Sequence, residues 1–61
     1  MQLSKYRVEA GVYDVGRYRI YYQGPKCWTL RDPADSIVDW FTTLRTAIRY
    51  AERLEEFHRD R

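Results

Sequence analysis

Several residue types on which protein chemistry often depends are scarce in this chain of 61 residues. It has one cysteine, Cys27, and one histidine, His58. A lone cysteine excludes an intramolecular disulfide and a thiolate zinc cluster, and it is typical of a reducing compartment. No run approaches 18 consecutive apolar residues, and no signal-peptide pattern opens the chain. We therefore expect a cytoplasmic protein with no membrane partner.

Catalytic and metal-binding motifs are also lacking. Cys27 and His58 are far apart in sequence and belong to no nucleophile motif. Asp32, Asp35 and Asp39 lack the glycine and the closing glutamate of a calcium loop. The three glycines do not form a phosphate-binding loop. We therefore predict no enzymatic activity, no metal site and no cofactor.

What the chain does have is aromatic residues and charge. Ten residues are Tyr, Trp or Phe, and 33% are charged. This composition is too rich in aromatic residues for a disordered chain and supplies one small core, so we expect a single domain over residues 1–61. Residues 1–31 contain six basic and two acidic residues, whereas residues 32–61 contain five arginines and seven acidic residues. The first half is thus the part suited to an anion.

The clearest pattern is that of a helix near the end of the chain. Apolar residues recur at steps of three and four and lie on one side of a helix. They are Leu44, Ala47, Ile48, Ala51, Leu54 and Phe57 or His58. A hydroxyl of Thr42 or Thr43 can cap the first turn. We predict that the helix begins there and frays near His58.

Alternating residues predict strands before this helix. Residues 6–12, 17–23 and 26–31 alternate apolar and polar side chains, with turns at Asp14-Val15-Gly16 and Gly24-Pro25. The predicted inward side chains are Tyr6, Val8, Ala10, Val12, Tyr18, Ile20, Tyr22, Trp28 and Leu30.

Residues 32–41 allow two interpretations. Asp32 and Pro33 can begin a helix, or they can form a turn before a short strand over residues 36–41. The second is favoured because Thr42-Thr43 suits a helix start better than a helix interior. The predicted fold class is α+β, with a small antiparallel meander of three to four strands packed on one C-terminal α-helix.

Two binding hypotheses follow from these faces. The strand alternation places basic and aromatic residues on the sheet face away from the helix. Arginines bind phosphates and guanine edges, and a tyrosine among them can stack, so this face suits nucleic acid. The candidate residues are Arg7, Arg17, Arg19, Tyr21 and Arg31. A plain solvent-exposed sheet face would also be polar, and that interpretation stays open.

A resemblance bears on the same face. An aromatic residue followed by Phe41-x-Thr43, then Ala47 and Tyr50-Ala51, resembles the domains of plant ethylene-response transcription factors and the arm-binding ends of phage integrases. It covers roughly residues 18–51 and implies strands that lie in the DNA major groove, with the helix behind them. The chain is also similar to short proteins of actinobacteria and their phages with a Phe-x-Thr-Leu-x-x-Ala helix, which implies a cytoplasmic protein, in the host cytoplasm if phage-encoded.

The second hypothesis is a protein-binding or regulatory module with a protein partner, or a homodimer. The core is too small for every aromatic residue, and exposed aromatic residues anchor interfaces. The interface candidates are Tyr13, Tyr21, Trp40, Tyr50 and Phe57. The first strand also offers a free edge. The acidic second half and the modest net charge of +2 favour this hypothesis over DNA binding.

Overall fold

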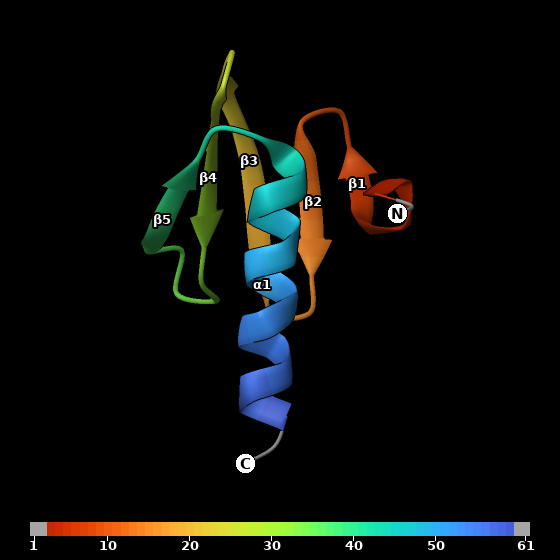
Figure 1. Cartoon of the computed structure of the whole chain (residues 1–61), viewed down its shortest axis with the longest axis vertical. Helices are drawn as coiled ribbons and strands as arrows, with labels where there is room; N and C mark the ends of the chain where they lie inside the picture. Colours follow the sequence, from red (N-terminus) through yellow and green to blue (C-terminus); the bar gives the residue numbers. More distant parts are fainter. Residues whose placement is uncertain (1–2, 60–61) are drawn as a thin grey trace.

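A computed structural model describes residues 3–59, and it consists of one antiparallel sheet with one helix against it (Figure 1). The elements follow one another along the chain without long connections. They are η1, a 3-10 turn (Leu3–Tyr6), β1 (Arg7–Glu9), β2 (Val12–Val15), β3 (Tyr18–Gly24), β4 (Cys27–Arg31), β5 (Ile37–Phe41) and α1 (Leu44–Arg59). The five strands pair in the order β1-β2-β3-β4-β5, and every pair is antiparallel. The predicted α+β meander packed on a C-terminal helix is confirmed, with five strands in the described residues.

The first predicted strand is wrong, because residues 6–12 fold into parts of three elements. Tyr6 ends η1, and the chain reverses at Ala10 and Gly11 between β1 and β2. Gly11 has φ +77°, a left-handed conformation that glycine adopts without steric cost. Its carbonyl accepts a hydrogen bond from the amide of Tyr22 at 2.8 Å. The side chain of Val8, predicted to face the core, is exposed as a result.

The other predicted turns are present, and residues 32–41 are extended. The turn after β2 lies at Gly16 and Arg17 and so begins two positions later than predicted, and Asp14 and Val15 belong to β2. Pro25 and Lys26 form the turn between β3 and β4. β5 confirms the favoured strand and excludes the helical interpretation. The helix begins at Leu44, directly after the predicted cap at Thr42 or Thr43, and the Thr43 hydroxyl accepts a hydrogen bond from the Thr46 amide at 3.2 Å.

The core lies between α1 and the middle of the sheet. Its buried apolar residues are Val15, Tyr18, Ile20, Leu30, Ala47, Ile48 and Ala51, and Trp28, Leu44 and Leu54 pack around them. These residues include most of the inward positions predicted for strands and helix. Tyr22 is an exception with 49% of its surface exposed. It lies toward the end of β3, where the β3 and β4 strands extend past the start of α1 (Figure 1).

A hydrogen bond ties η1 to the helix. The Tyr6 hydroxyl donates to Oε2 of Glu52 in α1, and this hydrogen bond, together with burial, raises the pKa of the Tyr6 phenol above its ordinary value of 10.0. A phenol whose pKa is raised by folding stabilises the fold below its unfolded pKa and loses that contribution as pH rises through the folded pKa.

Removing this hydroxyl tests the link directly. We expect Tyr6→Phe to lower the free energy of unfolding by about 1 kcal/mol near neutral pH, because one hydrogen bond is lost. The difference from the wild type should shrink as pH rises beyond about 10, where the wild-type phenol ionises. Urea unfolding of both proteins at several pH values measures this difference. A gap that stays constant into alkaline solution would contradict the assignment.

Candidate functional site

The sheet face opposite α1 brings together three of the predicted nucleic-acid-binding residues. Arg19 pairs with Arg31 across β3 and β4, and Tyr21 pairs with Thr29 two residues further along β3. Their neighbours Ile20 and Leu30 are buried in the core beside the helix. Since side chains alternate along a strand, Arg19, Tyr21 and Arg31 share the face away from α1.

The other two predicted arginines are placed differently, and because Arg7 lies on the helix side the expectation that all five share one face is wrong. Arg17 lies at the turn before β3, and its Nε is 3.0 Å from Oε2 of Glu55 in α1. Arg7 is paired with Tyr13, which packs against the core beside Trp28. Paired residues on neighbouring strands point to the same face, which places Arg7 on the helix side.

Acidic partners hold the two arginines of the outer face. Nε and Nη2 of Arg19 donate to the two carboxylate oxygens of Asp14 at 2.5 and 2.9 Å. This hydrogen bonding raises the pKa of the Arg19 guanidinium above its already high ordinary value. Nη1 of Arg31 donates to the carbonyl oxygen of Asp35 at 2.9 Å and lies 3.4 Å from its carboxylate. The charge of each arginine is therefore partly neutralised by a neighbouring aspartate.

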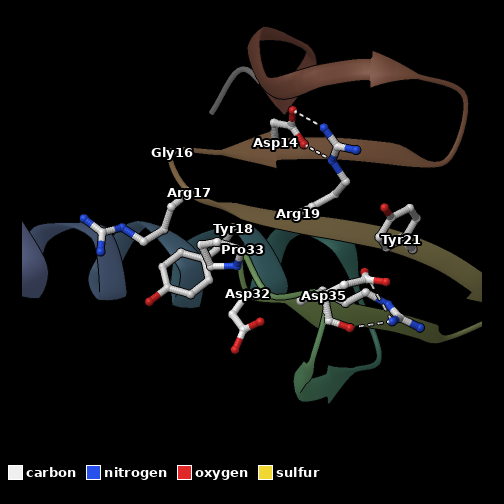
Figure 2. Close-up of a pocket in the computed structure, with 10 residues that line it drawn as sticks. Asp14, Gly16, Arg17, Tyr18, Arg19, Tyr21, Asp32, Pro33 and Asp35 are labelled. Atoms are coloured by element: carbon white, nitrogen blue, oxygen red, sulfur yellow. Dashed lines mark hydrogen bonds and ion pairs between the residues drawn. The ribbon is translucent and has the colours of Figure 1, made fainter.

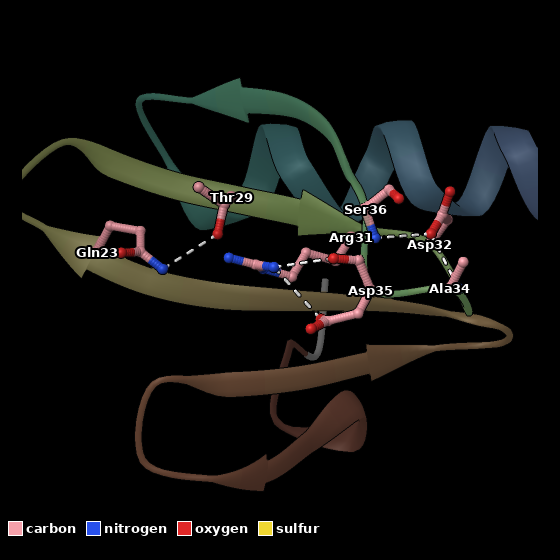
Figure 3. Close-up of polar contacts among 7 residues, drawn as sticks. All are labelled: Gln23, Thr29, Arg31, Asp32, Ala34, Asp35 and Ser36. Carbon is pink, nitrogen blue, oxygen red and sulfur yellow. Dashed lines mark hydrogen bonds and ion pairs between the residues drawn. The ribbon is translucent and has the colours of Figure 1, made fainter.

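The loop between β4 and β5 is organised by Asp32 (Figure 3). Its carboxylate accepts hydrogen bonds from the amides of Ala34 at 3.0 Å and Ser36 at 2.9 Å. The Asp32 amide donates to the Ser36 carbonyl, and its carbonyl accepts from the Asp35 amide. Asp35 has φ +66°, a conformation that aspartate tolerates better than most residues. These contacts fix the position at which Asp35 meets Arg31.

An open hollow of about 450 Å³ lies between these groups. Figure 2 shows the Asp14 and Arg19 pair on one side of it and the loop that contains Asp32 and Asp35 on the other. The lining residues are Asp14, Gly16, Arg17, Tyr18, Arg19, Tyr21, Arg31, Asp32, Pro33 and Asp35. Three arginines and three aspartates line the hollow, so its charges balance.

The five aromatic interface candidates do not form one patch. Tyr13 packs against the core with its ring edge-on to Trp28, and the ring of Tyr50 lies 5.3 Å from that of Phe41. The guanidinium of Arg31 lies over the ring of Tyr21, with Cζ 5.6 Å from the ring centroid. Trp40 and Phe57 are the most exposed of the five, at 60% and 57%. Phe57 lies near the end of α1, whereas Trp40 lies on β5.

β5 forms one edge of the sheet and is unusually apolar for an exposed edge. It pairs with β4 alone among the described strands, and Ile37, Val38 and Trp40 are all exposed. The last strand of a meander lies at an edge of the sheet, and at this edge Ile37 and Val38 are exposed. One backbone donor of this strand is already bonded: the Trp40 amide donates to the carboxylate of Asp39 at 2.7 Å.

The opposite edge is less suited to binding another strand. β1 has three residues, two of which, Arg7 and Glu9, are charged, and η1 precedes it directly. Short and charged edge strands resist pairing with other chains. The edge predicted at the first strand is therefore less accessible than the edge at β5.

Comparison with protein-family models, with curated proteins and with solved structures finds no match to this chain. No helix within residues 3–59 is long and apolar enough to cross a membrane. The described side chains include no group of three or more His, Cys, Asp or Glu residues arranged to hold a metal ion. Cys27 is a free thiol of intermediate exposure, and the side chain of His58 lies outside the described residues.

Proposed function

We propose that this protein is a non-enzymatic protein-binding module that receives an extended segment of a partner protein along β5. The observation that carries the proposal is the 60% exposure of Trp40 in the interior of an edge strand. An edge strand offers backbone donors and acceptors to an added strand, and its exposed side chains offer apolar contact. β5 combines an edge position with exposed apolar side chains, and of its backbone donors the Trp40 amide is the one that the Asp39 carboxylate already binds.

The side chains of β5 supply the apolar contribution to such binding. Ile37 and Val38 are 41% and 39% exposed, so an added strand would remove apolar surface from water at three of the five positions when Trp40 is included. Tryptophan is enriched among residues that dominate binding energy, because its large ring excludes much water on contact. Trp40 is paired with Thr29, and this pairing places its ring on the face opposite α1.

The charge around β5 indicates the chemistry of the partner. Residues 32–44 contain three aspartates and no lysine, arginine or histidine. A partner segment that alternates apolar and basic side chains would complement both the exposed apolar positions and the acidic ones. In a symmetric antiparallel pair of β5 strands, Asp39 at the centre of each strand would oppose its own copy, which disfavours a homodimer through this edge.

The arrangement of the arginines supports a protein partner over nucleic acid. Arg17, Arg19 and Arg31 each have an acidic partner, and Arg7 lies on the helix side of the sheet. A phosphate backbone approaching the outer face would meet the exposed carboxylate of Asp35 as well as the arginines. Such repulsion reduces the electrostatic contribution on which most nucleic-acid affinity depends.

A peptide titration tests this proposal. The probe is a fluorescent peptide of alternating valine and lysine, and binding is followed by anisotropy near physiological salt. One control alternates valine and glutamate. A second control alternates proline and lysine, so that it keeps the positive charge but has half of its backbone donors removed.

We expect saturable binding of the valine–lysine peptide and at least tenfold weaker binding of both controls. If the proline–lysine peptide bound as tightly as the valine–lysine peptide, positive charge alone would account for the affinity, and strand addition would be contradicted. Absence of binding by the valine–lysine peptide, together with concentration-dependent dimerisation in sedimentation equilibrium, would point to a second copy as the occupant.

A further inference from the structure

Two arginines oppose each other at the hollow on the outer face, which is an unfavourable arrangement unless something compensates it. Arg19 and Arg31 are direct partners in the ladder between β3 and β4. Like charges at directly opposed positions of a sheet destabilise it. Here two neighbouring aspartates compensate the repulsion. Asp14 of β2 forms an ion pair with Arg19, and Asp35 of the loop after β4 forms one with Arg31. Across the sheet, the order of charges is therefore acid, base, base, acid.

Both guanidinium groups have N–H donors beyond those that bond to the two aspartates. Arg19 uses Nε and Nη2 toward Asp14, and Arg31 uses Nη1 toward Asp35. A guanidinium carries more N–H donors than these described contacts use. Both arginines line the same hollow, so a ligand held there would lie against both side chains.

The two side chains are also held in place before any ligand arrives. The two carboxylate oxygens of Asp14 accept hydrogen bonds from Nε and Nη2 of Arg19, and this bidentate contact fixes the orientation of the guanidinium. The ring of Tyr21 supports the guanidinium of Arg31 from one side, and the loop ordered by Asp32 fixes the Asp35 carbonyl to which it donates. A planar guanidinium that is already positioned loses less side-chain entropy on binding an oxyanion.

We propose that this hollow binds a single oxyanion, a carboxylate or a phosphate group, between Arg19 and Arg31. An anion there would accept hydrogen bonds from two guanidinium groups whose charges the flanking aspartates neutralise only in part. Three aspartates balance the three arginines of the lining, which suits one anionic group and disfavours a polyanion such as nucleic acid. This site goes beyond the proposed function, because it uses neither the edge of β5 nor Trp40.

Titration followed by NMR tests the site. Inorganic phosphate and acetate are added separately at constant ionic strength, while the backbone amides and the arginine Nε–H signals are observed. We expect saturable shifts at Arg19, Tyr21 and Arg31 with a Kd of about 1–10 mM. A stronger response to phosphate would assign the phosphate group as the ligand, and a stronger response to acetate would assign the carboxylate.

Three substitutions test whether the anion binds at Arg31 in particular. Arg31→Gln should weaken binding at least tenfold, and Arg53→Gln, on an exposed position of α1, should leave it unchanged. Asp35→Asn should tighten binding several-fold, because it removes a competing carboxylate while asparagine tolerates the left-handed backbone at this position. Shifts that do not saturate, or equal affinity in the wild type and the Arg31→Gln protein, would overturn the proposal.

Discussion

Trp40→Ala is expected to weaken binding of the valine–lysine peptide by about 30-fold, which corresponds to a loss of about 2 kcal/mol. The side chain lies 60% exposed on β5, so its removal leaves the core intact. The free energy of unfolding should therefore change by no more than about 0.5 kcal/mol. Anisotropy titrations of wild type and variant, with urea unfolding of both, measure the two effects separately.

Phe57→Ala is the matched control for this substitution. Phe57 is 57% exposed, nearly as much as Trp40, but it lies near the far end of α1 and not on β5. We expect peptide affinity within a factor of two of the wild type for this variant, a change of about 0.4 kcal/mol. If Phe57→Ala weakened binding as much as Trp40→Ala, the contact surface would include the helix, and the assignment to β5 would fail.

Ile48→Ala is expected to have the largest effect on stability, a loss of about 2–5 kcal/mol. The Ile48 side chain is fully buried between α1 and the sheet, and its truncation leaves a cavity. A domain of 61 residues has a small core, and total stability is often near 5 kcal/mol at the lower end of the usual range. The variant should therefore be largely unfolded or melt far below the wild type in thermal unfolding followed by circular dichroism.

Ile37→Ala provides the same chemical change at an exposed position. Ile37 lies on β5 with 41% of its surface exposed, and we expect its truncation to lower stability by less than about 1 kcal/mol. Equal destabilisation by the two substitutions would show that β5 is packed as tightly as the core. That result would remove the exposed apolar surface on which the proposed function rests.

The sequence predicted the parts of the fold in which periodicity is strong. Ala47, Ile48 and Ala51 recur at helical spacing, and Tyr18 and Ile20 alternate, so α1 and β3 were placed correctly. Alternation failed in residues 6–12, because two short antiparallel strands and one continuous strand show a similar pattern. The reversal at Gly11 depends on its positive φ and on a hydrogen bond to Tyr22 from a strand further along the chain.

The candidate sites were harder to predict, because they depend on contacts between residues that are distant in sequence. Arg17 was assigned to the outer face by alternation, but it lies at a turn and binds Glu55, which is 38 residues away. Thr29 does lie on the outer face and yet is buried, since it is flanked by Tyr21 and Trp40 and bonded by Gln23. Pairing partners of this kind become known only when the order of the strands is known.

Hydrogen exchange of the β5 amides, measured with and without the valine–lysine peptide, tests the central claim most directly. An added strand bonds to the edge backbone, so the β5 amides that point away from β4 should exchange at least tenfold more slowly in the complex. The amides of β1, at the opposite edge of the sheet, should keep their rates. Unchanged exchange along β5 in a saturated complex, with slowing elsewhere in the protein, would contradict the account.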